Sequence, residues 1–209
     1  MTGTLTPAGS VTGRHIDLPL AGSVSHDYTM VTRRELGELH EAGISADDFK
    51  AAFRHHPGGV AIVTGDDGTG PVAMTVSSVF SVSAEPPALV FSLSDGSSAT
   101  PHLLAAGSVV VHLLSPADVP LAKLAATHGS DRFGPDVTWD RLPTGEPYYP
   151  QVHTWLRGTI VDELQVGLST VAVVHVVEAK LPPEHEDISP LIYHNRRWVE
   201  ISDDSYITI

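Results

Sequence analysis

The stretch VAMTVSSVFSVSAEPPALVFSLSDGSSATP, residues 72–101, organises the rest of the chain. Two apolar runs rich in β-branched residues, 72–82 and 88–93, lie on either side of Pro86-Pro87. Because β-branched residues favour strands and a proline pair favours a turn, the pattern predicts a strand, a turn and a returning strand. This hairpin is the first element of the predicted fold.

The returning strand leads into the predicted start of a helix. Ser97 and Ser98 precede Thr100-Pro101, a good N-cap followed by the residue best tolerated at the first helical position, and the helix continues to Ala106. The first N–H groups of a helix lack intrahelical partners, and its N-terminus carries partial positive charge. Hydroxyls and free N–H groups at one point therefore predict a site for an anion.

A second polar cluster, Thr75 to Ser78, interrupts an otherwise apolar strand. Alternation of side chains places Thr75 and Ser77 on one face, and Val76 and Ser78 on the other. Buried hydroxyls need partners, and a ligand with carbonyls and ring nitrogens would supply them. The other interpretation is that these are ordinary strand and turn residues whose hydroxyls bond to the backbone.

The remaining segments predict a closed sheet. Helices are expected to open at Ser45, where Asp48 completes the cap pattern, and at Ser115. The turn 65–70 predicts a hairpin because it lacks the Gly-Lys-Ser/Thr ending of a phosphate loop, and 128–150 predicts a long irregular loop. Strands are expected at 60–64, 109–114, 154–163, 170–179, 191–194 and 198–201, the last closing the sheet. Short strands without regular strand–helix alternation favour a mainly β barrel with flanking helices.

Two regions are expected along the chain. Residues 1–44 predict an N-terminal arm and helix, because the first thirty residues show no sustained period whereas Thr32 and Glu35 make a capping box. Residues 45–209 predict the main domain.

Composition excludes several classes of function. The 209 residues carry a formal net charge of -13, which argues against binding to nucleic acid. The absence of cysteine excludes disulfides and thiol catalysis, and the 12 histidines show no HExxH motif or clustered spacing, so no metal site is predicted. His112 and His175 lie within apolar strands, and each is expected to be a satisfied core or sheet-surface histidine. No apolar run approaches the roughly 20 residues that span a bilayer, so no membrane association and a cytoplasmic location are predicted.

The order of the motifs resembles the flavin reductase family. FRHHPGGVAIVTG at 53–65, the 72–101 stretch, SDRF at 130–133 and PLIYHNRRW at 190–198 follow one another as in small flavin-binding proteins that supply reduced flavin to two-component monooxygenases. The resemblance covers about residues 46–201. It implies a split β-barrel that pairs as a homodimer with flavin near the subunit interface, and a monooxygenase as partner.

The same resemblance implies which residues hold the flavin, FMN or FAD. Arg132 would offer its guanidinium fork to a phosphate or a substrate carboxylate, the alternative being a surface ion pair. His194 is expected to point toward the flavin pocket. The ring is expected against Met74, Thr75, Val76, Ser77 and Ser78, and the phosphate at Ser97, Ser98 and Thr100.

The chain departs from the family pattern at three places. Many members carry Gly-Asp-His before the penultimate strand, with the His near the nicotinamide, but this chain has Gly167-Leu168-Ser169. Val174 and Arg196 stand where glycine is common. Because the flavin carries the chemistry, hydride transfer from NAD(P)H requires no protein acid or base. The sequence therefore predicts an NAD(P)H-dependent flavin reductase, with a flavin-binding carrier or sensor lacking reductase activity as the alternative.

Overall fold

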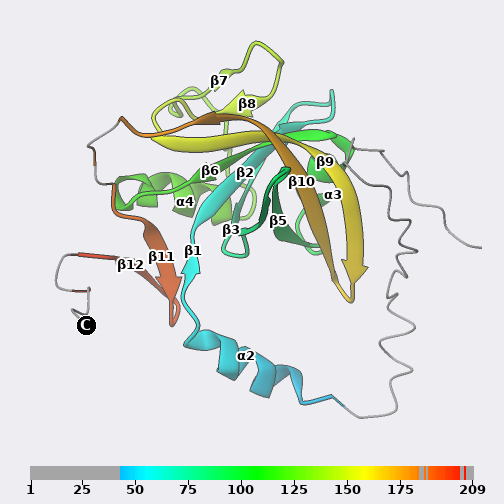
Figure 1. The fold of residues 1–209 in the computed structure, drawn as a ribbon, viewed down its shortest axis with the longest axis vertical. Coiled ribbons are helices and arrows are strands. Elements are labelled where there is room, and N and C mark those ends of the chain that lie inside the picture. The colour runs from blue at the N-terminus through cyan, green and yellow to red at the C-terminus, as the bar shows by residue number, and fades with distance from the viewer. Residues whose placement is uncertain (1–42, 184–185, 187, 203–204, 206–209) are drawn as a thin grey trace, which may run out of the picture.

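The computed structural model describes residues 43–183, 186, 188–202 and 205 (Figure 1). The helix predicted from Thr32 and almost all of the predicted arm lie outside these residues. The helices are α2 (Ala46–Arg54), α3 (Thr100–Ala105) and α4 (Val119–Ala126), with a 3₁₀ turn η1 (Pro116–Asp118). The strands are β1 (Gly58–Gly59), β2 (Ala61–Asp66), β3 (Pro71–Val76), β4 (Phe80–Ala84), β5 (Pro87–Ser94), β6 (Ser108–Leu113), β7 (Asp140–Arg141), β8 (Pro147–Tyr148), β9 (Thr154–Val166), β10 (Ser169–Lys180), β11 (Leu191–His194) and β12 (Arg197–Glu200).

Seven strands form one antiparallel sheet in the order β3-β2-β6-β9-β10-β5-β4. Its two edges, β3 and β4, are separated in the chain only by residues 77–79. Six strand spacings of about 4.8 Å would put the edges of a flat sheet about 29 Å apart. The connection from Val76 to Phe80 reaches at most about 14 Å. The sheet therefore curls until its edges approach, which confirms the mainly β split barrel with flanking helices.

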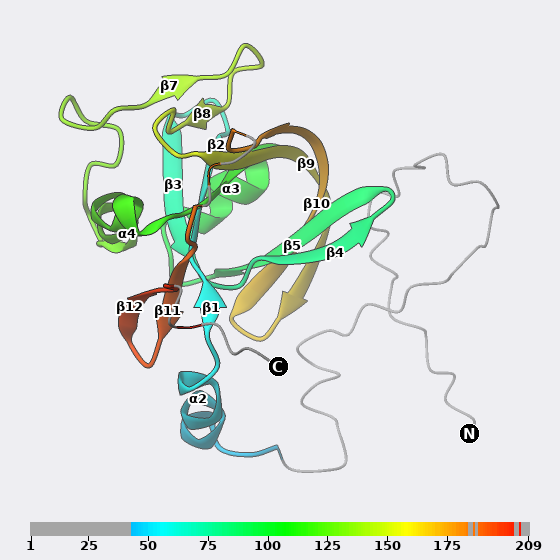
Figure 2. The ribbon, with the colours of Figure 1, turned by 60° about the vertical axis from the view of Figure 1, so that its left-hand side comes forward.

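The corner at residues 77–79 corrects one prediction. A single strand was expected over 72–82, but β3 ends at Val76 and β4 begins at Phe80 on the opposite edge of the sheet. Figure 2 shows β3 running to this corner and the β4–β5 hairpin projecting away from it. The alternation of apolar residues shows which face of a sheet a side chain occupies, but not which neighbouring strand its own strand pairs with. The break between β3 and β4 therefore could not be seen in the apolar pattern.

Side chains of the sheet alternate between two apolar layers. In β2, Ala61 and Val63 belong to the cluster inside the barrel, whereas Ile62 belongs to the cluster under α4. In β3, Met74 packs against the interior cluster, and Ala73 belongs to the outer one. Because side chains alternate, Thr75, the next odd-numbered residue of β3, also faces α4.

α3 packs closely on β2 because Gly65 makes room for it. A Cβ at Gly65 would lie 3.2 Å from the Ala106 Cβ and 3.3 Å from the Leu103 Cδ2. Leu103 is fully buried in the interior cluster. The glycine thus brings α3, and the loop that precedes it, against the barrel.

A separate three-stranded sheet, in the order β1-β11-β12, lies beside the barrel (Figure 1). β12 was expected to close the main sheet, but it pairs with β11, so that prediction is wrong. The cause is the two-residue turn Asn195-Arg196, whose φ angles of 47° and 61° suit a tight hairpin. This turn holds β12 next to β11.

α2 stands beside this small sheet rather than on the barrel (Figure 2). Its predicted cap is confirmed, because the Asp48 N–H donates to the Ser45 Oγ at 3.1 Å. Phe49 and Phe53 share a face as expected, yet they are 53% and 56% exposed. The Asn195 N–H donates to the Arg54 carbonyl at 3.0 Å and ties the end of α2 to the β11–β12 turn.

Candidate functional site

The outer face of β3 opens into a small cavity. The Thr75 hydroxyl donates to the Ala122 carbonyl of α4 at 2.8 Å. Ser77 lies on the same face, as alternation predicts. The cavity has a volume of about 190 Å³ and is lined by Val60, Thr75, Val76, Ser77, Ala126, Tyr193 and Trp198. Two aromatic rings, Tyr193 and Trp198, stand opposite the polar strand end, with ring centroids 5.1 Å apart.

The other members of this cluster serve the barrel. Val76 is buried in the interior cluster, and Met74 is half-buried against it. The Ser78 hydroxyl accepts from the Ser92 N–H at 3.0 Å and lies 3.3 Å from the Ser92 carbonyl. This serine therefore joins the corner to β5.

The hydroxyls of the segment before α3 differ in whether they already form hydrogen bonds within the protein. Thr100 is buried, and its hydroxyl donates to the Ser94 carbonyl at 2.6 Å. The Ser97 Oγ accepts from the Ala99 N–H at 3.3 Å. Ser98 is exposed, and its hydroxyl bonds to none of the described residues. Ser98 is thus fully open to a ligand, and Ser97 still has its O–H free to donate.

The N-cap of α3 differs from the predicted one. Ala99 occupies the cap position, and Thr100 is the first helical residue instead of the cap. The reason is the short bond from the Thr100 hydroxyl to the Ser94 carbonyl, which draws that side chain back toward β5. Gly107 ends the helix with φ 71°, as expected.

Hydrogen bonds link the two predicted motifs. Ser78 bonds to Ser92, and Thr100 bonds to Ser94, two residues further along β5. Two strand residues span about 7 Å. The structure therefore brings the end of the first motif and the start of the second to neighbouring points on one strand.

Arg132 lies at the end of α4. Its Nε donates to the Ala125 carbonyl at 3.1 Å and its Nη2 to the Thr127 carbonyl at 2.9 Å. These carbonyls have no intrahelical donor, so the guanidinium stabilises the helix end. Among the described residues, the Arg132 guanidinium bonds to the end of α4 and not to the loop before α3 or to Asp131.

A larger groove of about 480 Å³ adjoins the Ser77 cavity, and the sequence did not predict it. It lies between α2, the barrel corner and the β11–β12 turn. Basic and aromatic side chains line it together with Ser77 and Ser78, namely Phe49, Lys50, Phe53, Arg54, Phe80, Tyr193 and Arg196. The one available signal was Arg196 at a position where a tight turn favours glycine. His194 contacts the end of α2 nearby, since its ring centroid is 6.1 Å from that of His55.

The β9–β10 hairpin tip carries the departure at Gly167-Leu168-Ser169. Leu168 is 67% exposed, and its carbonyl accepts from the Asp95 N–H at 3.0 Å. The Asp95 carboxylate also accepts from the Gln165 Nε2 at 2.8 Å. The tip is therefore held against the loop that leads to α3.

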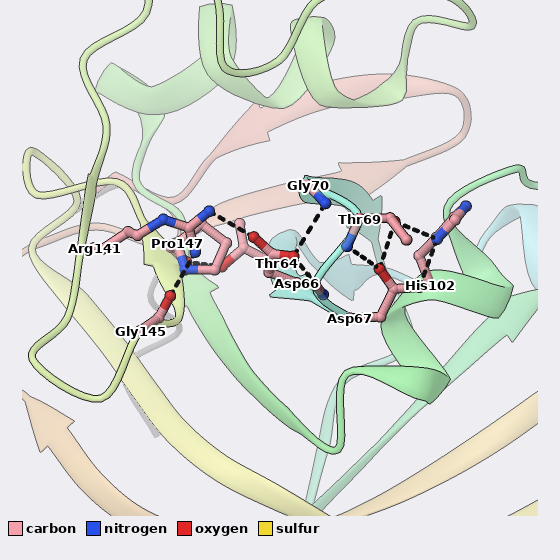
Figure 3. Close-up of polar contacts among 10 residues, drawn as sticks. Thr64, Asp66, Asp67, Thr69, Gly70, His102, Arg141, Gly145 and Pro147 are labelled. Atoms are coloured by element: carbon pink, nitrogen blue, oxygen red, sulfur yellow. Dashed lines mark hydrogen bonds and ion pairs between the residues drawn. The ribbon is translucent and has the colours of Figure 1, made fainter.

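Charged groups on the β2–β3 turn form a separate cluster (Figure 3). His102 Nδ1 lies 2.8 Å from the Asp67 Oδ2, and the Thr69 hydroxyl donates to the other Asp67 oxygen at 2.5 Å. Hydrogen bonds from Thr69 and His102 lower the pKa of Asp67 to about 2. Arg141 pairs with Asp66 at 2.5 Å on the other side of the turn. These contacts stabilise the hairpin that the sequence predicted here in preference to a phosphate loop.

Two classes of site are not found in the described part of the chain. Its residues contain no group of three or more His, Asp or Glu side chains arranged to hold a metal. Among the same residues, no helix is long and apolar enough to cross a membrane.

Comparisons with known proteins bear on the family and the fold. A family model described as the flavin reductase like domain matches residues 53–202. An NADH:FMN oxidoreductase of Rhodococcus qingshengii is 38% identical over 157 residues, which are 75% of this chain and 82% of that protein. A flavin reductase (NADPH) of Lentzea aerocolonigenes is 32% identical over 163 residues, covering 75% and 91%. The crystal structure of a flavin reductase domain protein from Arthrobacter sp. FB24 has a TM-score of 0.70 and 34% identity, covering 76% of this chain and 96% of that one.

Proposed function

The chain belongs to the flavin reductase like domain family, and we propose on that basis that it transfers a hydride from NAD(P)H to FMN or FAD. The observation that carries the proposal is the cavity at the end of β3. It combines the Ser77 backbone and hydroxyl with the facing Tyr193 and Trp198 rings, a combination that suits a flat heteroaromatic ligand.

Some of the residues in the loop before α3 fit a flavin phosphate. The open Ser98 hydroxyl is available to donate to a phosphate oxygen, with Ser97 beside it. The Thr100 hydroxyl is already used by Ser94, so Thr100 positions the loop rather than binding the phosphate directly. Arg132 remains a candidate contact through the part of its guanidinium that does not hold α4.

When bound, flavin would supply the chemistry by accepting a hydride at its ring. The protein binds and orients the two nucleotides and keeps water from the ring. Thr75, bonded to α4, holds the strand end in place, and Ser78, bonded to β5, holds the corner. No side chain is assigned as an acid or base.

The test is the visible absorbance of the purified protein, recorded without oxygen before and after FMN and then NADH are added. Flavin bands that bleach with NADH are expected of a reductase. The relatives named above use NADH in one case and NADPH in the other, so each donor is tried. Bands that persist with both donors would refute the reductase.

A flavin-binding carrier or sensor is the second candidate, and Leu168 is the observation that favours it. The resemblance matches Leu168 to the family's Asp and Ser169 to the His near the nicotinamide, so the polar pair is missing, and Leu168 is 67% exposed. A carrier would take up FMN without oxidising NADH or NADPH, so the same titration separates the two functions.

The proposal extends to three further properties. We expect a homodimer, a flavin-dependent monooxygenase that receives the reduced flavin, and a location in the cytoplasm. Exposed apolar side chains outside the groove, such as Val82 and Leu181, supply surface of the kind that a subunit contact covers. Sedimentation of the purified protein measures the first property, and coupled turnover with a candidate oxygenase measures the second.

A further inference from the structure

Positive charge gathers in the groove between α2 and the β11–β12 turn. Lys50, Arg54 and Arg196 all line this groove, and Lys50 also lies 3.6 Å from the Asp47 carboxylate, so the two arginines supply the charge that is unpaired among the described residues. The whole chain has only 12 Lys and Arg and a formal net charge of -13. Cations gathered in a concave site of an acidic protein attract an anion locally.

The two arginines of the groove are not used elsewhere in the described structure. Arg141 and Arg157, by contrast, are paired with the carboxylates of Asp66 and Glu146. Neither the Arg54 nor the Arg196 guanidinium forms an ion pair or hydrogen bond with another described residue. Their donors are therefore open to a ligand, and a guanidinium fork matches phosphate oxygens.

The backbone at Arg196 is unfavourable for an arginine. Its φ of 61° lies in the left-handed region, where a Cβ is disfavoured. Glycine suits this position of a two-residue hairpin turn better. An arginine held in a strained conformation at the rim of a groove points to a role for its side chain.

Aromatic side chains give the groove a second property. The Phe49 and Phe53 rings lie 4.7 Å apart between centroids and tilt by 35°. Tyr193 is shared between the groove and the cavity at the end of β3. Cations beside open aromatic faces suit a ligand that joins phosphates to a flat ring.

We propose that this groove holds the phosphates of the nicotinamide donor, with Arg196 as the main contact. The inference rests on the proposed reductase function, which requires two nucleotides at one site. The flavin phosphate is assigned to the loop before α3. The groove shares Ser77 with the ring cavity, so a donor whose phosphates lie in the groove reaches the ring from α2.

The experiment compares Arg196→Gly with Arg197→Ala. Arg197 is the next residue, is exposed in β12 and does not line the groove, so its replacement removes the same charge from the same hairpin. Arg196→Gly should raise the KM for NADH or NADPH roughly 10-fold or more, as loss of a charge-assisted hydrogen bond does. The FMN dissociation constant should not change, and the melting temperature should not fall because glycine relieves the turn. Arg197→Ala should change none of these quantities.

Three results would overturn the proposal. Weaker FMN binding in Arg196→Gly would assign the groove to the flavin phosphate. An equal rise in KM for both variants would indicate general charge attraction. A changed sedimentation coefficient without a changed KM would assign Arg196 to a subunit contact.

Failure of the reductase function is distinguishable from failure of the groove. Wild-type protein that oxidises neither donor would refute the function. Direct titration with NADP⁺ would still test the groove, because binding that is lost in Arg196→Gly and kept in Arg197→Ala would support it.

Discussion

Acidification should destabilise the protein through His112. This side chain is fully buried, its Nδ1 lies 3.1 Å from the Ile62 carbonyl, and its Nε2 accepts from the Tyr149 N–H at 3.1 Å. Of the two alternatives that the sequence left open, a core or a sheet-surface histidine, His112 is therefore the first. Burial disfavours the imidazolium form and lowers the pKa of His112 from 6.5 to about 4. Between these values the unfolded chain binds a proton that the folded chain does not, so stability falls as pH falls.

The size of the loss follows from the two pKa values. A difference of one unit corresponds to about 1.36 kcal/mol, so the full loss near pH 4 is about 3 kcal/mol, and the loss at pH 5 is about 2 kcal/mol relative to pH 8. Urea unfolding at fixed protein concentration from pH 8 to pH 5 measures it. His112→Gln is the control variant, because the amide has a donor and an acceptor but does not titrate. Wild type should lose about 2 kcal/mol more than the variant over this range, and parallel pH curves would refute the reasoning.

Three further substitutions, one of them also combined with a second change, test the site and the barrel. Ser98→Ala should weaken FMN binding with an unchanged melting temperature, whereas Thr100→Ala should cost about 1 to 2 kcal/mol of unfolding free energy because the Ser94 carbonyl loses its donor. Flavin titration and urea unfolding measure the pair, and unchanged flavin affinity in Ser98→Ala would remove the phosphate assignment. Gly158→Ala should cost about 1 to 3 kcal/mol, since its Cβ would overlap the Val174 Cγ1 and lie 2.5 Å from the His175 carbonyl oxygen. Adding Val174→Ala should restore only part of the stability measured by urea unfolding, and full restoration would show that the carbonyl contact costs nothing.

Much of the fold follows from local sequence. The hairpins around residues 65–70 and 86–87, the cap at Ser45, and β11 within its predicted bounds follow from periodicity and turn chemistry. The corner at 77–79 does not, because pairing partners are a property of the whole sheet. The same limit explains β12, whose apolar pattern fits either sheet, and whose partner is selected by the Asn195-Arg196 turn.

The parts of the candidate site that come from one segment of the chain could be predicted. Alternation correctly placed Thr75 and Ser77 on one face of β3, toward α4. The sequence did not predict that the Thr100 hydroxyl would donate to the Ser94 carbonyl. A residue type identifies a possible donor, but it does not give the distance to an acceptor. The basic groove is assembled from α2 and a turn about 140 residues later, so no spacing within either segment signals it.

The departures from the family pattern differ in how the structure accommodates them. Val174 is accommodated across the sheet by Gly158, whose missing Cβ leaves the space that the valine occupies, so this exchange concerns packing.

Leu168 removes a polar side chain, yet Asp95 still holds the hairpin tip against the loop before α3. The backbone of Leu168 and the side chain of Gln165 thus hold the tip without the family's polar pair.

Arg196 has no such accommodation, because its backbone remains in the left-handed region. The resemblance places the missing His, matched here by Ser169, near the nicotinamide, and the gained cation lies in a groove that adjoins the cavity at the end of β3. If the groove binds the donor phosphates as proposed, both changes concern one ligand. They are mutually consistent if this chain recognises its hydride donor less through the nicotinamide ring and more through the phosphates, for which the strained arginine is the structural evidence.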